Sequence, residues 1–277
     1  MDKTNFTLDE IRQDCSELEK SILDLYLKRT KQKDICETLL IKRGTIDTLV
    51  KKYKLTRFRD RSNYTIDEKC LYEENPNIWY FLGIFASDGN LHTTNSNTQI
   101  IQFTLDDLDV LQHIKEILGY TGEIKEYFKL GKIRYFLSIS NKALIAFVNK
   151  IFNADCHRKT DDIIFPDVPN EECMIMFLRG FIDGDGSFRV SPNNTFYRFS
   201  IYCKSEDFIF KLKEIIENII EKPCSFYNSN TIELSSKKDN YKLFKFLYEK
   251  IDNPYYMFRK YERAKQHIIA YEKELKI

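Results

Sequence analysis

An internal repeat constrains the fold of this chain more than any other feature. FLGIFASDG at residues 81–89 returns as LRGFIDGDG at 178–186, so that two Asp-Gly pairs stand with Asp88 and Asp185 97 residues apart. After each copy come a strand-like stretch, a helical stretch, a hairpin and a further helix. In the helical stretches, DLDVLQHIKEI (107–117) corresponds to SEDFIFKLKEI (205–215). The repeat predicts an α+β fold of two pseudo-symmetric halves, each ordered αββαββα.

Basic residues are concentrated before the repeat begins. Residues 27–62 contain 12 Lys and Arg against 4 Asp and Glu, whereas the whole chain has a net charge of only +1. Two short helical patterns at 31–39 and 42–55 meet at a tight junction, which resembles a helix-turn-helix. A solvated basic helix is the alternative interpretation. As DNA contacts of a helix-turn-helix we expect Lys42, Arg43, Thr45 and Lys51.

These patterns divide the chain into a small all-α domain and two repeated halves. The expected boundaries are a helix-turn-helix domain at 1–55, a linker at 56–75, a first half at 76–152, a second linker at 153–170, and a second half with a C-terminal helix at 171–277. An apolar content of 43% is sufficient for a core of this size.

Composition also excludes several classes of protein. No apolar run approaches the roughly 18 residues of a membrane span, and the N-terminus MDKTNFTLDE lacks the layout of a signal peptide. We therefore expect no membrane association and a cytoplasmic location, or an organellar one if an organelle genome encodes the chain. The seven cysteines and four histidines are dispersed, which disfavours a zinc site.

Small residues within the repeated segments predict how the two halves pack. Gly83 and Ser87 in the first copy, and Gly180 and Gly184 in the second, are four residues apart, so each pair lies on one face of a helix. Residues without bulky side chains allow two helix backbones to approach closely. We expect the two helices to pack against each other along these faces. The glycines that follow the aspartates are expected to be left-handed helix caps.

This packing would bring the carboxylates of Asp88 and Asp185 together at two helix C-termini. A carboxylate at the negative end of a helix dipole is disfavoured by roughly 0.3–1 kcal/mol, and two carboxylates repel each other as well. A divalent cation removes this conflict, because hard ions prefer carboxylate and water oxygens. A pair of such ions about 3.5–4 Å apart can hold both the attacking and the leaving oxygen of a phosphodiester.

At these residues the chain resembles the LAGLIDADG homing endonuclease family, in particular its single-chain members with two motif copies. The resemblance covers about residues 76–265 and implies site-specific hydrolysis of double-stranded DNA by a monomer at a long recognition site. It implies that Asp88 and Asp185 bind Mg2+, with Mn2+ as a substitute and Ca2+ supporting binding without cleavage. The first copy departs from the motif at Ala86 and Ser87. The earlier acid of the motif, Asp183 here, is expected to be non-catalytic.

The family also uses the two sheets as a saddle over DNA. Alternating side chains that would face the major groove are Gln102, Thr104, Lys125, Tyr127, Arg134 and Ser138 in the first half, and Arg198, Ser200, Tyr202 and Lys204 in the second. A lysine often lies near the scissile phosphate in this family, and Lys142 and Lys238 stand at equivalent positions after the later hairpins. These two lysines are the expected catalytic cations.

Two other functions remain open from the sequence. One is a non-catalytic DNA-binding regulator on the same scaffold. The other is an intron maturase that binds RNA, since a basic sheet can serve either polymer.

Overall fold

The structure is a computed structural model that describes residues 15–28, 30, 32–53, 55, 64–95, 97–129, 131–152, 163–190, 197–228 and 230–275. Residues 1–14 of the expected N-terminal domain, 56–63 of the first linker and 153–162 of the second lie outside this range. The chain divides into two compact units, residues 1–63 and 64–277.

The N-terminal unit is built from short helices. They are α2 (Glu17–Leu27), α3 (Gln32–Leu39) and α4 (Arg43–Lys52). Helix α2 begins with a capping box, in which Ser16 and Glu19 each accept a hydrogen bond from the other's backbone N–H. The helices enclose a small core of their own, made of Ile22, Leu23, Tyr26, Ile35, Ile46, Leu49 and Val50.

The second unit contains the two repeated halves. The first half consists of the short 3-10 helix η1 (Glu68–Cys70), α5 (Pro76–Asp88), β1 (Asn90–Thr93), β2 (Gln99–Leu105), α6 (Leu108–Ile117), β3 (Lys125–Lys129), β4 (Lys132–Ile139) and α7 (Lys142–Phe152). The second consists of α9 (Glu171–Asp185), β5 (Ser187–Val190), β6 (Tyr197–Tyr202), α10 (Glu206–Ile220), β7 (Phe226–Asn228), β8 (Thr231–Leu234), α11 (Lys237–Tyr248) and α12 (Phe258–Leu275). The predicted α+β class and the αββαββα order are confirmed.

Each half forms one antiparallel four-stranded sheet with the same topology. The strand orders are β1-β2-β4-β3 and β5-β6-β8-β7. Alternate side chains enter the core, such as Phe103 from β2 and Phe199 from β6, while their neighbours lie on the opposite face. A single hydrophobic core runs through both halves. None of the helices in the described part of the chain is long and apolar enough to cross a membrane.

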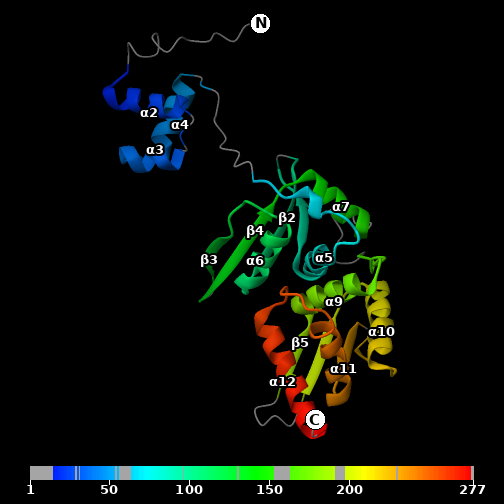
Figure 1. Ribbon diagram of the computed structural model, residues 1–277. Coiled ribbons are helices and arrows are strands. Elements are labelled where there is room, and N and C mark those ends of the chain that lie inside the picture. The colour runs from blue at the N-terminus through cyan, green and yellow to red at the C-terminus, as the bar shows by residue number, and fades with distance from the viewer. Residues whose placement is uncertain are drawn as a thin grey trace. The chain divides into compact units, whose positions relative to one another are not determined.

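Helices α5 and α9 join the two halves. They lie next to each other between the two sheets and contact each other more extensively than any other pair of elements described (Figure 1). A Cβ atom added to Gly83 would lie 2.3 Å from Phe177 O, and one added to Gly180 would lie 2.3 Å from Tyr80 O. Because the backbones are already in contact there, no residue larger than glycine fits without separating the helices.

The glycines that follow these helices do not have the expected left-handed conformation. Gly89 has φ −71° and ψ 145°, and Gly186 has φ −69° and ψ 140°, so both are extended. The reason is that β1 and β5 begin at the next residue, which leaves no room for a reversal of the chain. Glycine is needed for space instead, since a Cβ at Gly186 would lie 2.5 Å from Ile182 O.

Residues 64–75, which the sequence assigned to a linker, belong to the second unit. The Asp67 backbone N–H donates to Leu118 O at 2.8 Å, and the Thr121 N–H donates to Thr65 O at 3.0 Å. Ile66 and Leu71 pack against the core. The first half therefore begins at about residue 64.

The C-terminal helix α12 packs against α11 and carries a buried histidine. His267 is only 2% exposed, and its ring lies edge-on against Tyr197 and Phe244. Among the described residues, none forms a hydrogen bond with its ring nitrogens. Burial lowers the pKa of His267 from 6.5 to about 4, so the folded protein holds this ring neutral.

The Gly180→Ala substitution is expected to lower the free energy of unfolding of the second unit by about 1–3 kcal/mol, because the new methyl group overlaps Tyr80 O. Urea unfolding followed by tryptophan fluorescence measures this loss, since Trp79 lies in α5. Gly44→Ala is the control: no atom lies within 4 Å of the new methyl group, and alanine favours the helix. Equal stability of the Gly180→Ala variant and the wild type would contradict the close packing.

The His267→Phe substitution is expected to flatten the dependence of stability on pH. The unfolded chain binds a proton at His267 with a pKa near 6.5 and the folded chain only near 4, so its contribution is present above pH 6.5 and is lost as the pH falls toward 4. The loss amounts to about 3 kcal/mol, and phenylalanine removes it. Urea unfolding between pH 4.5 and 7.5 measures it. If the free energy of unfolding changes equally with pH in the variant and the wild type, His267 is not the source of the pH dependence.

Candidate functional site

The two repeated aspartates end the two packed helices. Asp88 is the last residue of α5 and Asp185 the last of α9, and both are exposed. A Cβ atom at Gly184 would lie 1.8 Å from Ser87 Oγ and 2.7 Å from Asp88 Oδ2. The Asp88 carboxylate therefore lies over the backbone of the residue that precedes Asp185. The glycine packing that the sequence predicted thus brings the two helix ends together.

The chemistry of this place is that of hard-cation ligands. Two carboxylates stand beside the backbone carbonyls of two helix C-termini, which is a concentration of negative charge. Within the described residues, no group of three or more His, Cys, Asp and Glu side chains is arranged to hold a metal ion. Mg2+ commonly binds through one or two carboxylates and completes its shell with water and substrate phosphates. The donor set present fits that mode of binding.

Asp183, the earlier acid of the second motif copy, is fully buried. Its carboxylate accepts hydrogen bonds from Tyr80 Oη at 3.0 Å, Tyr248 Oη at 2.9 Å and the Met257 backbone N–H at 2.7 Å. Burial raises the pKa of Asp183 to about 6, although these hydrogen bonds and Lys260 favour the charged form. The equivalent residue of the first half is Ala86, which has no polar side chain. Asp183 therefore connects both halves with the C-terminal segment.

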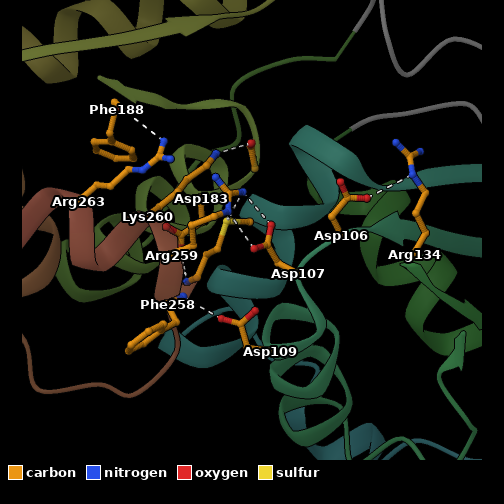
Figure 2. A network of polar contacts seen from close by, with 12 residues as sticks. Asp106, Asp107, Asp109, Arg134, Asp183, Phe188, Phe258, Arg259, Lys260 and Arg263 are labelled. Atoms are coloured by element: carbon orange, nitrogen blue, oxygen red, sulfur yellow. Dashed lines mark hydrogen bonds and ion pairs between the residues drawn. The ribbon is translucent and has the colours of Figure 1, made fainter. Parts of the chain in front are cut away.

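We call residues 253–260 the junction segment, because they contact both halves (Figure 2). On the first half, Arg259 forms two hydrogen bonds with Asp107, at 3.0 and 2.8 Å, and the Phe258 N–H donates to Asp109 Oδ2 at 2.7 Å. On the second half, Arg179 donates to Asn253 O and Tyr255 O at 3.0 and 3.2 Å. This buried guanidinium also reaches Leu247 O at 2.8 Å.

Lys260 extends from the junction segment to the end of α9. Its ammonium donates to Gly184 O at 2.6 Å and Ile182 O at 3.2 Å. Burial lowers the pKa of Lys260 to about 8, while the carboxylates of Asp183, Asp88 and Asp185 act in the opposite direction. A lysine ammonium thus lies within electrostatic range of both repeated aspartates.

The polar face of the first sheet carries all six side chains that the sequence placed on it. In the strand register, Gln102 lies opposite Ser138, Tyr127 opposite Arg134, and Lys125 and Thr104 both opposite Phe136. Residues directly opposite in an antiparallel pair share a face. Lys129 and Lys132 extend the same face toward the end of the hairpin.

The polar face of the second sheet is less basic. Ser200 lies opposite Ser187 and Glu233, and Arg198 lies opposite Arg189. The Arg198 guanidinium is 3.2 Å from Glu233 Oε1, so one positive charge of this face is paired. Tyr202 ends β6 on the same face. Lys204 follows the strand and is exposed, outside the regular sheet.

The two lysines expected to be catalytic lie at helix starts. Gln102 of β2 pairs with Asn90 of β1 on one side and with Ser138 of β4 on the other, so Ser138 lies level with Asn90. From Ser138 onward, β4 runs in the same direction as β1, away from Asp88. Lys142 follows that far end as the first residue of α7. Lys238 is the second residue of α11. It lies near Glu221, whose pKa is lowered mainly by a hydrogen bond with Lys242 and to a smaller extent by the charge of Lys238.

In the N-terminal unit, the four predicted DNA contacts all belong to the start or the exposed side of one helix. Lys42 is the N-cap of α4 and makes no side-chain capping hydrogen bond. Lys42, Arg43, Thr45 and Lys51 are exposed. The Arg43 Nε donates to Gln32 Oε1 at 3.0 Å.

Sequence reasoning missed Asp183 and the junction segment as parts of the site's surroundings. One signal was available: an acid within an otherwise apolar and buried helix needs hydrogen-bond partners. The basic start of the C-terminal helix was a second signal. Neither signal identifies which backbone carbonyls or carboxylates these groups meet.

The fold and site therefore define an α+β protein in which two sheets flank a pair of packed, acid-terminated helices. A family model described as a LAGLIDADG-like domain matches residues 172–244. The matched residues extend from α9 into α11.

Comparison with curated whole proteins gives a relative of low sequence identity. An uncharacterized protein of Methanocaldococcus jannaschii is 26% identical over an alignment of 186 positions, and the alignment covers 63% of each chain. This chain therefore spans about 63% of the length of that curated relative.

Similar solved structures have low sequence identity. The LAGLIDADG homing endonuclease I-GzeII in complex with its DNA target is 15% identical, covers 73% of this chain and 91% of its own, and has a TM-score of 0.46. I-SmaMI bound to uncleaved DNA target with calcium ions is 14% identical, with coverages of 72% and 92% and a TM-score of 0.43. The N-terminal LAGLIDADG domain of DUF199/WhiA is 13% identical, with coverages of 71% and 92% and a TM-score of 0.44.

Proposed function

We propose that this protein is a single-chain, two-motif DNA endonuclease that makes a double-strand break at a long recognition site by metal-dependent hydrolysis. The observation that carries the proposal is the meeting of Asp88 and Asp185 at the ends of two helices whose backbones are in contact. The match of residues 172–244 to the LAGLIDADG-like domain supports it. The reaction breaks one phosphodiester bond in each strand.

In this mechanism Asp88 and Asp185 would hold Mg2+ on their exposed carboxylates, at the negative ends of α5 and α9. When bound, Mg2+ stabilises the charge that develops on the phosphodiester oxygens during attack by water. The close packing at Gly83 and Gly180 keeps the two helix ends at a fixed separation, so that both carboxylates act on one short stretch of duplex. Mn2+ is expected to substitute for Mg2+, and Ca2+ to support DNA binding without cleavage.

The polar sheet faces supply the DNA contacts in this proposal. The first face carries Lys125, Lys129, Lys132 and Arg134 among aromatic and amide side chains, which suits phosphate and base-edge contacts. The second face contributes Arg189, Arg198, Ser200 and Tyr202. Exposed Lys42, Arg43, Thr45 and Lys51 of α4 add a further contact if the N-terminal unit acts as a helix-turn-helix. The protein would act as a monomer, in the cytoplasm or in an organelle.

Asp185→Asn is expected to abolish cleavage while DNA affinity stays within about threefold, because the amide keeps the shape of the carboxylate but loses the charge that holds the cation. The target is obtained by selecting cleaved molecules from a library of random duplexes in Mg2+. Linearisation of a plasmid that carries the selected site, and fluorescence anisotropy in Ca2+, then measure cutting and binding. Asp88→Asn should behave in the same way.

Exposed Asp252 is the matched control, since Asp252→Asn makes the same change of charge outside the helix ends. This variant should cut at the wild-type rate in Mg2+, and no protein should cut in EDTA. Full cutting by Asp185→Asn would remove Asp185 from the site. Binding without cutting in Mg2+ and Mn2+ by the wild type would favour the regulator, and preferential binding of structured RNA would favour the maturase.

The double substitution Lys129→Ala and Lys132→Ala is expected to reduce the slope of log affinity against log salt by about 1.8, since each lysine that meets a phosphate contributes about 0.9. These lysines lie opposite each other on the first sheet. Lys211 of α10 and Lys245 of α11, which pair with Glu214 and Glu249, provide the matched control pair. Fluorescence anisotropy between about 50 and 300 mM salt measures this slope. An unchanged slope would place the DNA elsewhere.

A further inference from the structure

The lysine at the end of α9 is unusual for its burial. Lys260 is 6% exposed, although lysine is almost never fully buried unless its charge is paired. Its ammonium donates to Gly184 O and Ile182 O, the carbonyls of the last turn of α9. Both carbonyls lie at the negative end of the helix dipole. Ile182 O also accepts from the Gly186 N–H at 2.8 Å, so Lys260 is its second donor.

The residue whose carbonyl this ammonium contacts lies next to both candidate ligands. Gly184, whose carbonyl it contacts at 2.6 Å, directly precedes Asp185. The Asp88 carboxylate lies close to the same glycine, with Oδ2 2.7 Å from the position of a Cβ. One lysine, which the C-terminal helix provides, therefore contacts the end of α9 and lies within electrostatic range of both repeated carboxylates.

The anchoring of the junction segment holds this lysine in place. Before Lys260 in the chain, Arg259 donates two hydrogen bonds to Asp107 of the first half, and the Met257 N–H donates to Asp183 of the second. On the following turn, Arg263 donates to Phe188 O of β5 at 3.3 Å. Because contacts on both halves fix α12 at its start, Lys260 cannot leave the helix ends without breaking them.

We propose that Lys260 is a positioning residue of the candidate metal centre: its charge holds the ends of α5 and α9 together without metal and lowers the affinity of Asp88 and Asp185 for a divalent cation. The proposal rests on the assignment of these two aspartates as the metal ligands. Its physical basis is that an ammonium offsets the mutual repulsion of the carboxylates and the dipole ends, but repels an incoming cation. The charge, rather than the hydrogen bonds alone, is the active property.

Lys260→Gln separates these two properties, because the amide can still donate to a carbonyl but carries no charge. A double-mutant cycle of Lys260→Gln with Asp88→Asn, run in EDTA without DNA, measures the coupling through urea unfolding. We expect Lys260→Gln to destabilise the wild type more than the Asp88→Asn protein, with at least about a fivefold difference in the unfolding equilibrium constant. Additive effects would overturn the proposal.

Metal binding gives the second measurement. Calorimetric titration with Mn2+, without DNA, should show binding about tenfold tighter in Lys260→Gln than in the wild type, and Ca2+ should raise the melting temperature of the variant by more. Lys260→Arg keeps the charge and should bind Mn2+ like the wild type. Lys265→Gln makes the same substitution at an exposed lysine of α12 and should also leave affinity unchanged. Unchanged or weaker binding by Lys260→Gln would overturn the proposal.

The two assignments can fail separately. If the wild type binds Mn2+ and Asp185→Asn does not, the metal ligands stand, and only the comparison of Lys260→Gln with Lys260→Arg judges the role of Lys260. If neither the wild type nor Lys260→Gln binds Mn2+, or if Asp185→Asn binds it equally well, the metal assignment fails and the proposal for Lys260 fails with it. Should Lys260→Gln not fold, Lys260→Met in the Asp88→Asn background completes the cycle, and recovery of folding there supports the proposal.

Discussion

The backbone contact between α5 and α9 is the constraint on which the second unit depends. Gly83 and Gly180 let each helix approach the other to a distance at which a methyl group would overlap a carbonyl oxygen. One hydrophobic core can then run through both halves, and the two sheets lie on either side of the pair. The same contact determines the separation of Asp88 and Asp185, because both end their helices. Packing and chemistry are thus set by the same few residues.

The C-terminal segment breaks the symmetry of this arrangement. Asp183 binds the junction segment through the Met257 N–H, whereas Ala86 stands at the equivalent place in the first half and offers no acceptor. The first half is held instead through Asp107 and Asp109, which lie at the start of α6. A single element therefore contacts both copies of a duplicated fold, and this element places the ammonium of Lys260 at the end of α9.

Sequence patterns predicted the repeated elements well because those patterns are local. Alternation along RFSIYC placed Arg198 and Ser200 on one face of the sheet and Phe199 and Ile201 on the other. The burial pattern of β6 confirms this assignment. Predictions that needed tertiary contacts were less complete. The extended conformation of Gly89 follows from the immediate start of β1, and the membership of residues 64–75 in the second unit follows from hydrogen bonds to Leu118 and Thr121. The position of Lys260 depends on a helix 75 residues distant from Asp185 along the chain, a contact that no local period encodes.

The charges of the second unit also indicate how metal and substrate would be coupled. The helix ends offer two carboxylates rather than a complete cage, and a lysine already satisfies the nearby carbonyls. A divalent ion that binds there still lacks most of its ligands, which phosphates and water can supply. Under the function proposed above, the lysines of the first sheet would attract the same phosphates toward that face. Under the function proposed above, the cation and the DNA would therefore bind more tightly together than separately, because each supplies charge or ligands that the other lacks. Such coupling would restrict hydrolysis to duplex that is already seated across both sheets.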